Sequence, residues 1–248
     1  MLSRVLMVGL LAGLVAGLAL AVLQHFTMTP MIVEAESFEH AGEVAQSGVL
    51  RDFGDAKLIL AHTAADPAAG EHDHGGEAGW APEDGLERTV YTGLATILCA
   101  VGFAFVLLAG MLIAGDEITE RRAIGWGLAA FVATGLAPAF GLSPELPASA
   151  AAALEARQLW WLATAVCTGV SLWLFLRTGT PWAKGLAIVI LIAPHVVGAP
   201  QPEAFESRVP AELSAEFAAR SISFMALTWV AVAWAGGALW RRLGGAAH

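Results

Sequence analysis

The densest group of potential ligands is the run Glu71-His72-Asp73-His74, which lies in a glycine-rich segment. Imidazole and carboxylate groups both suit first-row divalent metal ions. A flexible loop would let His72, Asp73 and His74 reach a single ion, although ordering the loop costs entropy and keeps the affinity modest. Two interpretations stay open here: a loop that collects metal ions, or a solvated loop without a ligand.

Two further histidines, His25 and His195, lie near the ends of long apolar segments. Ionisable groups at membrane depth are costly, so they usually face a cavity or a partner. The acidic residues that follow these segments and the third apolar segment are Glu34, Glu36, Glu145 and Glu203. Carboxylates leading to two imidazoles would concentrate cations and then remove part of their hydration shell. The alternative is that both histidines make ordinary hydrogen bonds at the membrane interface.

The sequence lacks the motifs of several common enzyme classes. It contains no GxxxxGK[ST] phosphate loop, no GxGxxG, HExxH or GxSxG motif, and no CxxCH haem attachment site. The net charge of -9 argues against nucleic-acid binding, which needs basic surface. Cys99 and Cys167 lie in apolar runs and are predicted to be small core residues. We therefore expect a protein that is not an enzyme and has no prosthetic group.

The elements that must position these residues are apolar segments long enough to cross a membrane. The chain is 57% hydrophobic and only 14% charged, whereas soluble domains carry roughly 25% charged residues. The six segments are 5–26, 90–114, 123–141, 159–176, 182–199 and 218–240. The fifth is the weakest because it contains Lys184 and Pro194, and the first also resembles a signal peptide. The prediction is one all-α integral membrane domain over residues 1–248, with about six transmembrane helices, or five.

Charge predicts the orientation of these spans. With six spans both termini lie on the same side, and that side is basic, whereas residues 27–89 and the other opposite loops are strongly acidic. Since Lys and Arg near span ends mark the cytoplasmic side, we expect cytoplasmic termini in a bacterial inner membrane. The acidic, histidine-containing loop 27–89 is then periplasmic or extracellular.

Small and aromatic residues give further expectations about packing. Gly9, Gly13 and Gly17 share one helix face, which would permit close backbone contact with another helix unless they merely reflect abundant glycine. Trp160, Trp161 and Trp182 are predicted to lie in an interfacial aromatic belt.

The spans also show signs of an internal repeat. Residues 137–141 match residues 193–198 in their Ala-Pro pair and following glycine, and the even-numbered spans begin with Arg88, Arg157 and Arg220. We expect these arginines to anchor helix ends or to pair with Asp84, Glu155 and Glu216. The pattern predicts three helical hairpins in parallel orientation, with chance agreement as the alternative. Proline near a span end frees carbonyls near the outer interface, where irregular backbone usually lines a cavity.

Several segments are more specific in combination than any of them is alone. They are Gln24-His25 with Thr29-Pro30, Glu34-Ala35-Glu36, His72-Asp73-His74 leading to Trp80-Ala81-Pro82-Glu83-Asp84-Gly85, Gly102-Phe103-Ala104, Leu136-Ala137-Pro138, Pro144-Glu145-Leu146-Pro147, Arg157-Gln158-Leu159-Trp160-Trp161, Pro194-His195 with Gly198-Ala199-Pro200, and Pro210-Ala211-Glu212-Leu213. Over nearly the whole chain they resemble the CbtA family of cobalt transporter subunits.

This resemblance implies a membrane protein that takes up cobalt for cobalamin synthesis beside CbtB, a small single-span partner subunit with histidines. The family is usually described with about five spans. The expected cargo is Co2+ or a similar divalent ion. The residues expected to contact it are His25, His195, His72, His74, Asp73, Glu34, Glu36 and Glu145. The alternative is a non-transporting membrane subunit that scaffolds or stabilises a larger complex.

Overall fold

The computed structural model describes residues 1–38, 82–83, 85–205 and 207–244. Every regular element in these ranges is a helix, which confirms the all-α class. The elements are α1 Leu2–Thr27, α3 Leu86–Ile113, α4 Glu120–Phe131, the π-helical turn η1 Val132–Leu136, α5 Ala137–Ala139, α6 Leu154–Arg177, α7 Pro181–Val197 and α8 Ala211–Gly244. Residues 29–38 are also helical. His72, Asp73 and His74 lie outside the described residues.

Four of these helices, α1, α3, α6 and α8, are long and apolar enough to cross a membrane. The predicted third span falls on α4, η1 and α5, which follow one another from residue 120 to residue 139. The predicted fifth span falls on α7, a shorter apolar helix of 17 residues. The described part of the chain therefore contains four helices long enough to be spans, and the total of six stays a prediction.

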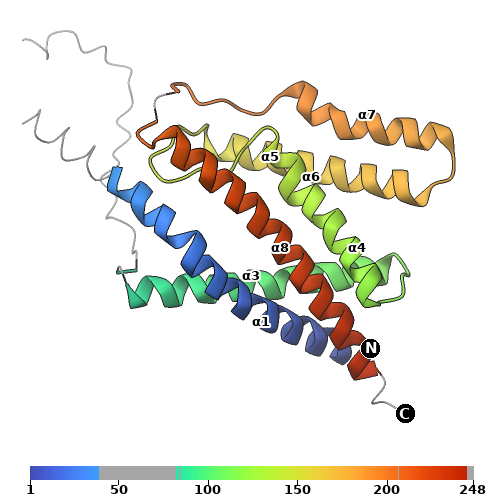
Figure 1. Ribbon diagram of the computed structural model, residues 1–248. Coiled ribbons are helices and arrows are strands. Elements are labelled where there is room, and N and C mark those ends of the chain that lie inside the picture. Colours follow the sequence, from blue (N-terminus) through green and yellow to red (C-terminus); the bar gives the residue numbers. More distant parts are fainter. Residues whose placement is uncertain (39–81, 84, 206, 245–248) are drawn as a thin grey trace, which may run out of the picture.

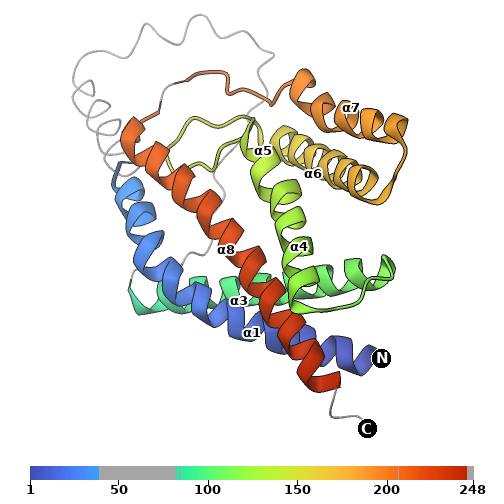
Figure 2. The same cartoon turned by 45° about the vertical axis from the view of Figure 1, so that its right-hand side comes forward.

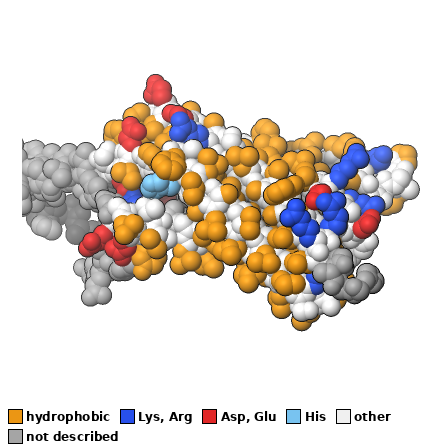
Figure 3. All heavy atoms as spheres, turned by 60° about the horizontal axis from the view of Figure 1, so that its bottom comes forward, with side chains coloured by type: hydrophobic (Ala, Val, Ile, Leu, Met, Phe, Trp, Pro, Cys, Tyr) orange, Lys and Arg blue, Asp and Glu red, His pale blue; other side chains and the backbone are white. Residues whose placement is uncertain are grey.

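The outer surface of the helices is strongly apolar. Large side chains such as Leu98, Val106 and Val189 are more than 60% exposed. Figure 3 shows a broad hydrophobic band, with most of the visible Lys and Arg side chains at one end and acidic side chains and a histidine at the other. An apolar band of this extent is suited to lipid, because large exposed apolar patches are unfavourable in water. The protein is therefore a membrane protein.

The three glycines of α1 form its contact with α3, as their spacing predicts. A Cβ atom at Gly13 would lie 2.3 Å from the backbone Cα of Val101, and one at Gly17 would lie 2.7 Å from the Cα of Ile97. Only hydrogen fits in these positions, so the two backbones approach more closely than any larger residue would allow. The glycine face of α1 is therefore confirmed as a packing surface.

Helix α8 connects the first helices of the chain to the third span. It packs on α1, α3 and α4, crossing α1 in Figures 1 and 2. Its residue Trp229 stacks on Phe103 of α3 at 4.7 Å between ring centroids and belongs to a buried apolar cluster with Val8 and Leu108. This packing buries the central part of α8.

The predicted third hairpin is wrong. Helix α1 packs on α3, and α6 packs on η1 and α5, as the first two hairpins require. Helix α7, however, forms its packed pair with α6, whereas α8 packs on α1 and α4. Figures 1 and 2 show α6 and α7 side by side. The proline and arginine patterns repeat along the chain, but they do not determine which helices become neighbours.

The two ends of the described chain lie together at the basic end of the molecule (Figure 1). The guanidinium of Arg4 in α1 lies 4.2 Å from the ring centroid of Trp240 in α8 and donates to the Trp240 carbonyl. Arg241 pairs with Glu120 at the start of α4 at 2.6 Å. These contacts place the starts of α1 and α4 beside the end of α8.

We expect Gly13→Ala to lower the free energy of unfolding by about 1–3 kcal/mol, because the new methyl group meets the backbone of Val101. Gly102→Ala is the matched control, since a Cβ there has no atom within 4 Å. Thermal unfolding of the purified variants in detergent measures the difference. Equal stability of the two variants would contradict close packing of α1 on α3.

Candidate functional site

His195 lines a cavity of about 650 Å³ at the end of α7 opposite its Lys184-bearing start. The imidazole is half-buried. Its ring stands edge-on to Trp160 of α6, with centroids 5.8 Å apart, and to Phe140 after α5, at 6.3 Å. Residues of η1, α5, α6 and α7 complete the walls. The cavity therefore offers one imidazole within mostly apolar and aromatic surroundings.

The sequence around His195 determines how α7 ends. Pro194 has no N–H to donate, so the last turn lacks one helical hydrogen bond. Gly198 then ends the helix with φ of 88°, a conformation that favours glycine, and its N–H donates to the Pro194 carbonyl at 3.1 Å. The same carbonyl accepts a hydrogen bond from Trp160 Nε1 at 3.2 Å. The backbone beside His195 is thus held from two directions.

A second cavity, of about 440 Å³, adjoins the first. Glu203 lines this second cavity, and Gln201 lines both. The Gln201 amide nitrogen donates to the Ala199 carbonyl at 3.2 Å, which leaves the amide oxygen as an acceptor. A carboxylate, an amide and an imidazole therefore follow one another across two adjoining cavities. The sequence identified His195 and Glu203, but Gln201 was missed because a glutamine in a proline-rich loop carries no distinctive signal.

His25 occupies a different position from His195. It is exposed in the last turn of α1, with its ring edge-on to Phe26 at 5.0 Å. The preceding residue, Gln24, lines a separate cavity of about 530 Å³ between α1, α3 and α8 and accepts a hydrogen bond from Thr96. Cys99 is exposed and also lines this cavity, so its predicted place in the core is wrong. The described cavities do not join the two histidines.

Two of the three predicted glutamate ligands are paired with arginine. Both carboxylate oxygens of Glu36 lie 2.8 Å from Arg88 Nη1. Glu145 lies 2.7 Å from Arg157 Nη2, and both side chains are about one quarter exposed. Glu34, in contrast, is exposed. The arginines thus compensate negative charge that was expected to attract cations.

The arginine partners differ partly from those expected. Arg220 pairs with Glu216, as predicted, and also donates to the Thr27 carbonyl at 3.0 Å. Arg157 pairs with Glu145, which precedes α6, instead of Glu155 on its own helix. The loop before α6 therefore folds back over the start of that helix. Within the described residues, no three His, Cys, Asp or Glu side chains come together as a metal site.

The two adjacent tryptophans of α6 satisfy backbone carbonyls in different helices. Trp160 is only 8% exposed, so it packs inside the protein, and its predicted place at the membrane interface stays a prediction. Trp161 Nε1 donates to the carbonyl of Thr134 at 3.1 Å. Pro138 cannot donate to this carbonyl, which lies four residues earlier. Trp182, in contrast, is 72% exposed. Trp160 and Trp161 therefore connect α6 to the proline-containing ends of two other helical segments.

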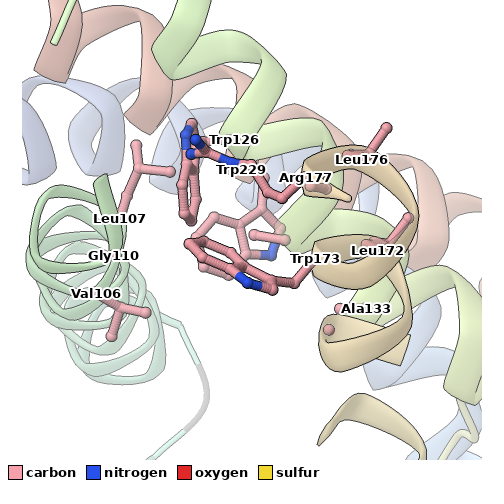
Figure 4. Close-up of a pocket in the computed structure, with 13 residues that line it drawn as sticks. Val106, Leu107, Gly110, Trp126, Ala133, Leu172, Trp173, Leu176, Arg177 and Trp229 are labelled. Carbon is pink, nitrogen blue, oxygen red and sulfur yellow. The ribbon is translucent and has the colours of Figure 1, made fainter. Parts of the chain in front are cut away.

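An apolar cavity of about 240 Å³ lies near the basic end of the molecule. Figure 4 shows Trp126, Trp173 and Trp229 at this cavity, with Arg177 beside them. Arg177 pairs with Asp116 in the loop after α3, and Trp126 Nε1 donates to the same carboxylate at 2.7 Å. The Trp126 hydrogen bond, aided by Arg177, holds the pKa of Asp116 below its ordinary value.

Comparison with known proteins gives one decisive result. A family model described as a probable cobalt transporter subunit, CbtA, matches residues 2–241. The chain belongs to the CbtA family. No curated protein and no solved structure matches the chain significantly. The CbtA description fits a membrane protein that is a transporter subunit, and the word subunit implies a partner.

We expect the pair of Glu145 and Arg157 to act as a unit. Glu145→Gln leaves Arg157 without its carboxylate, so this variant should be less stable, whereas adding Arg157→Gln should recover about 1 kcal/mol of coupling energy. The coupling is measured as a double-mutant cycle, from the unfolding of the single and double variants in detergent and from their cobalt uptake. Glu155→Gln, at an exposed position, is the control. If Glu145 is a transport ligand instead, the double variant recovers no uptake.

We also expect Trp126→Phe to raise the pKa of Asp116 toward its ordinary value, because the indole donor is lost. A lowered carboxyl pKa adds stability above the unfolded-state pKa, and this contribution disappears as the pH falls through the folded-state pKa. The pH at which the protein loses stability on acidification should therefore be higher in the variant. Unfolding between pH 7 and 3 tests this, with Trp173→Phe as control. If stability falls at the same acidic pH in the original protein and in Trp126→Phe, the Trp126 hydrogen bond does not lower the pKa of Asp116.

Proposed function

We propose that this CbtA-family protein moves a divalent transition-metal ion, Co2+, inward across a bacterial inner membrane for cobalamin synthesis. It would act with a small single-span CbtB-like partner. The observation that carries the proposal is the cavity in which His195 faces open space beside Gln201. Neutral imidazole nitrogen is a common ligand for divalent first-row ions.

The order of the metal-binding groups along the two cavities supports stepwise entry of a hydrated cation. Glu203 on the adjoining cavity attracts the ion, the amide oxygen of Gln201 replaces part of its water shell, and His195 contributes a nitrogen ligand. A site with few protein ligands binds weakly and lets the ion leave. His25 and Glu34 are exposed and would act earlier, in capture, together with His72, Asp73 and His74.

The length of α7 supports a position of His195 below the membrane surface. Its 17 residues span about 26 Å, less than the roughly 30 Å of the hydrocarbon layer. If Lys184 at its start lies at the cytoplasmic interface, His195 lies short of the opposite one. Six spans with cytoplasmic termini fit this arrangement, because the basic contacts of Arg4 and Arg241 lie at the same end.

We expect His195→Ala to lower cobalt uptake at least tenfold, which corresponds to about 1.4 kcal/mol of lost ion binding. Uptake of radioactive cobalt into proteoliposomes, with and without the small partner, measures the effect. His25→Ala is the matched control and should cause a smaller loss, because His25 lies outside the cavity. Unchanged uptake in a His195→Ala protein that inserts normally would contradict passage of the ion through the His195 cavity. Absence of uptake by the intact pair would favour a scaffolding subunit.

A further inference from the structure

Trp160 is the most deeply buried aromatic wall of the His195 cavity. Its side chain is 8% exposed, whereas Phe140 on the same cavity is 79% exposed. Gly141 makes room for the indole, since a Cβ there would lie 2.4 Å from Trp160 Cη2. The indole therefore packs directly against the backbone of Gly141, where a larger residue would displace it.

The same indole contacts both the side chain and the backbone around His195. Its ring lies edge-on to the imidazole, with centroids 5.8 Å apart and planes at 75°. Its Nε1 donates to the carbonyl of Pro194, the residue directly before His195. The backbone position and the ring plane of His195 are thus both constrained by one residue of another helix.

We propose that Trp160 is a positioning residue that holds the His195 imidazole in one orientation toward the cavity, an inference that rests on the proposed function. A side chain that is already ordered loses less rotamer freedom when an ion binds, so the ion binds more tightly. Trp160 itself has no nitrogen lone pair to offer a metal, because indole is a donor only. Its effect therefore passes through His195.

The neighbouring Trp161 provides a matched control. Its Nε1 also donates to a backbone carbonyl, that of Thr134, at 3.1 Å. Trp161 lines the cavity beside Pro138, not the cavity of His195. Trp160→Phe and Trp161→Phe therefore each remove one indole hydrogen bond between α6 and another helix. Only the first change affects a residue in contact with His195.

The first measurement needs no transport. Full-length protein in detergent is treated with diethyl pyrocarbonate, and peptide mass spectrometry gives the modification rate of each histidine. We expect Trp160→Phe to raise the rate at His195 at least threefold and to leave the rate at exposed His25 unchanged, whereas Trp161→Phe changes neither. If the bundle instead loosens generally, the modification rates of both histidines rise, or the rate at His195 rises in both tryptophan variants; either result contradicts the proposal.

The second measurement is cobalt uptake into proteoliposomes. We expect Trp160→Phe to raise the apparent KM about three- to tenfold with little change in the maximal rate, and Trp161→Phe to leave KM unchanged. Gly141→Ala displaces the Trp160 ring without altering a hydrogen-bonding side chain, so it should reproduce the effect on KM and on His195 modification.

The two proposals fail in different ways. Equal His195 reactivity in the two tryptophan variants, or a KM that rises equally in both, overturns the positioning role of Trp160. No uptake by the intact protein and its partner overturns the transport function. In that case a selective change in His195 modification still establishes that Trp160 orients the imidazole.

Discussion

Backbone carbonyls at membrane depth need donors, and this requirement organises the structure around the proline-containing segments. In hydrocarbon no water replaces a missing helical hydrogen bond. Pro138 removes the helical donor to the Thr134 carbonyl, which accepts from Trp161 Nε1 instead, whereas the Pro194 carbonyl accepts from both the Gly198 N–H and Trp160 Nε1. The consequence is that α6 determines where both irregular segments lie. The cavity of His195 forms where these segments depart from regular helix.

Close backbone contact plays the corresponding role in the other half of the molecule. The glycines of α1 bring it against α3, and Gly127 and Gly237 do the same for α4 and α8. Without a hydrophobic drive between helices in lipid, such packing contacts must supply much of the association. The α1, α3, α8 and α4 group thus relies on shape, whereas the α6 and α7 group relies more on side-chain hydrogen bonds to carbonyls.

The sequence predicted those features that depend on local spacing. The glycine face of α1, the long apolar helices and the common end of both termini all follow from periodicity and charge. The neighbours of α7 and the partner of Arg157 did not, because they depend on how loops fold and which helices cross. His195 was recognised as a polar residue in an apolar helix, but its cavity also requires Phe140 and Trp160 from distant segments.

The position of His195 depends on few contacts outside α6. Helix α7 packs on α6, where Ser171 donates to the Ala187 carbonyl at 2.7 Å and Trp160 to that of Pro194. These two bonds lie seven residues apart along α7, about two turns. They fix both the depth and the rotation of the helix, since each bond selects one carbonyl. A ligand on a helix held in this way stays aligned with its own cavity even if α6 and α7 move together relative to the glycine-packed helices.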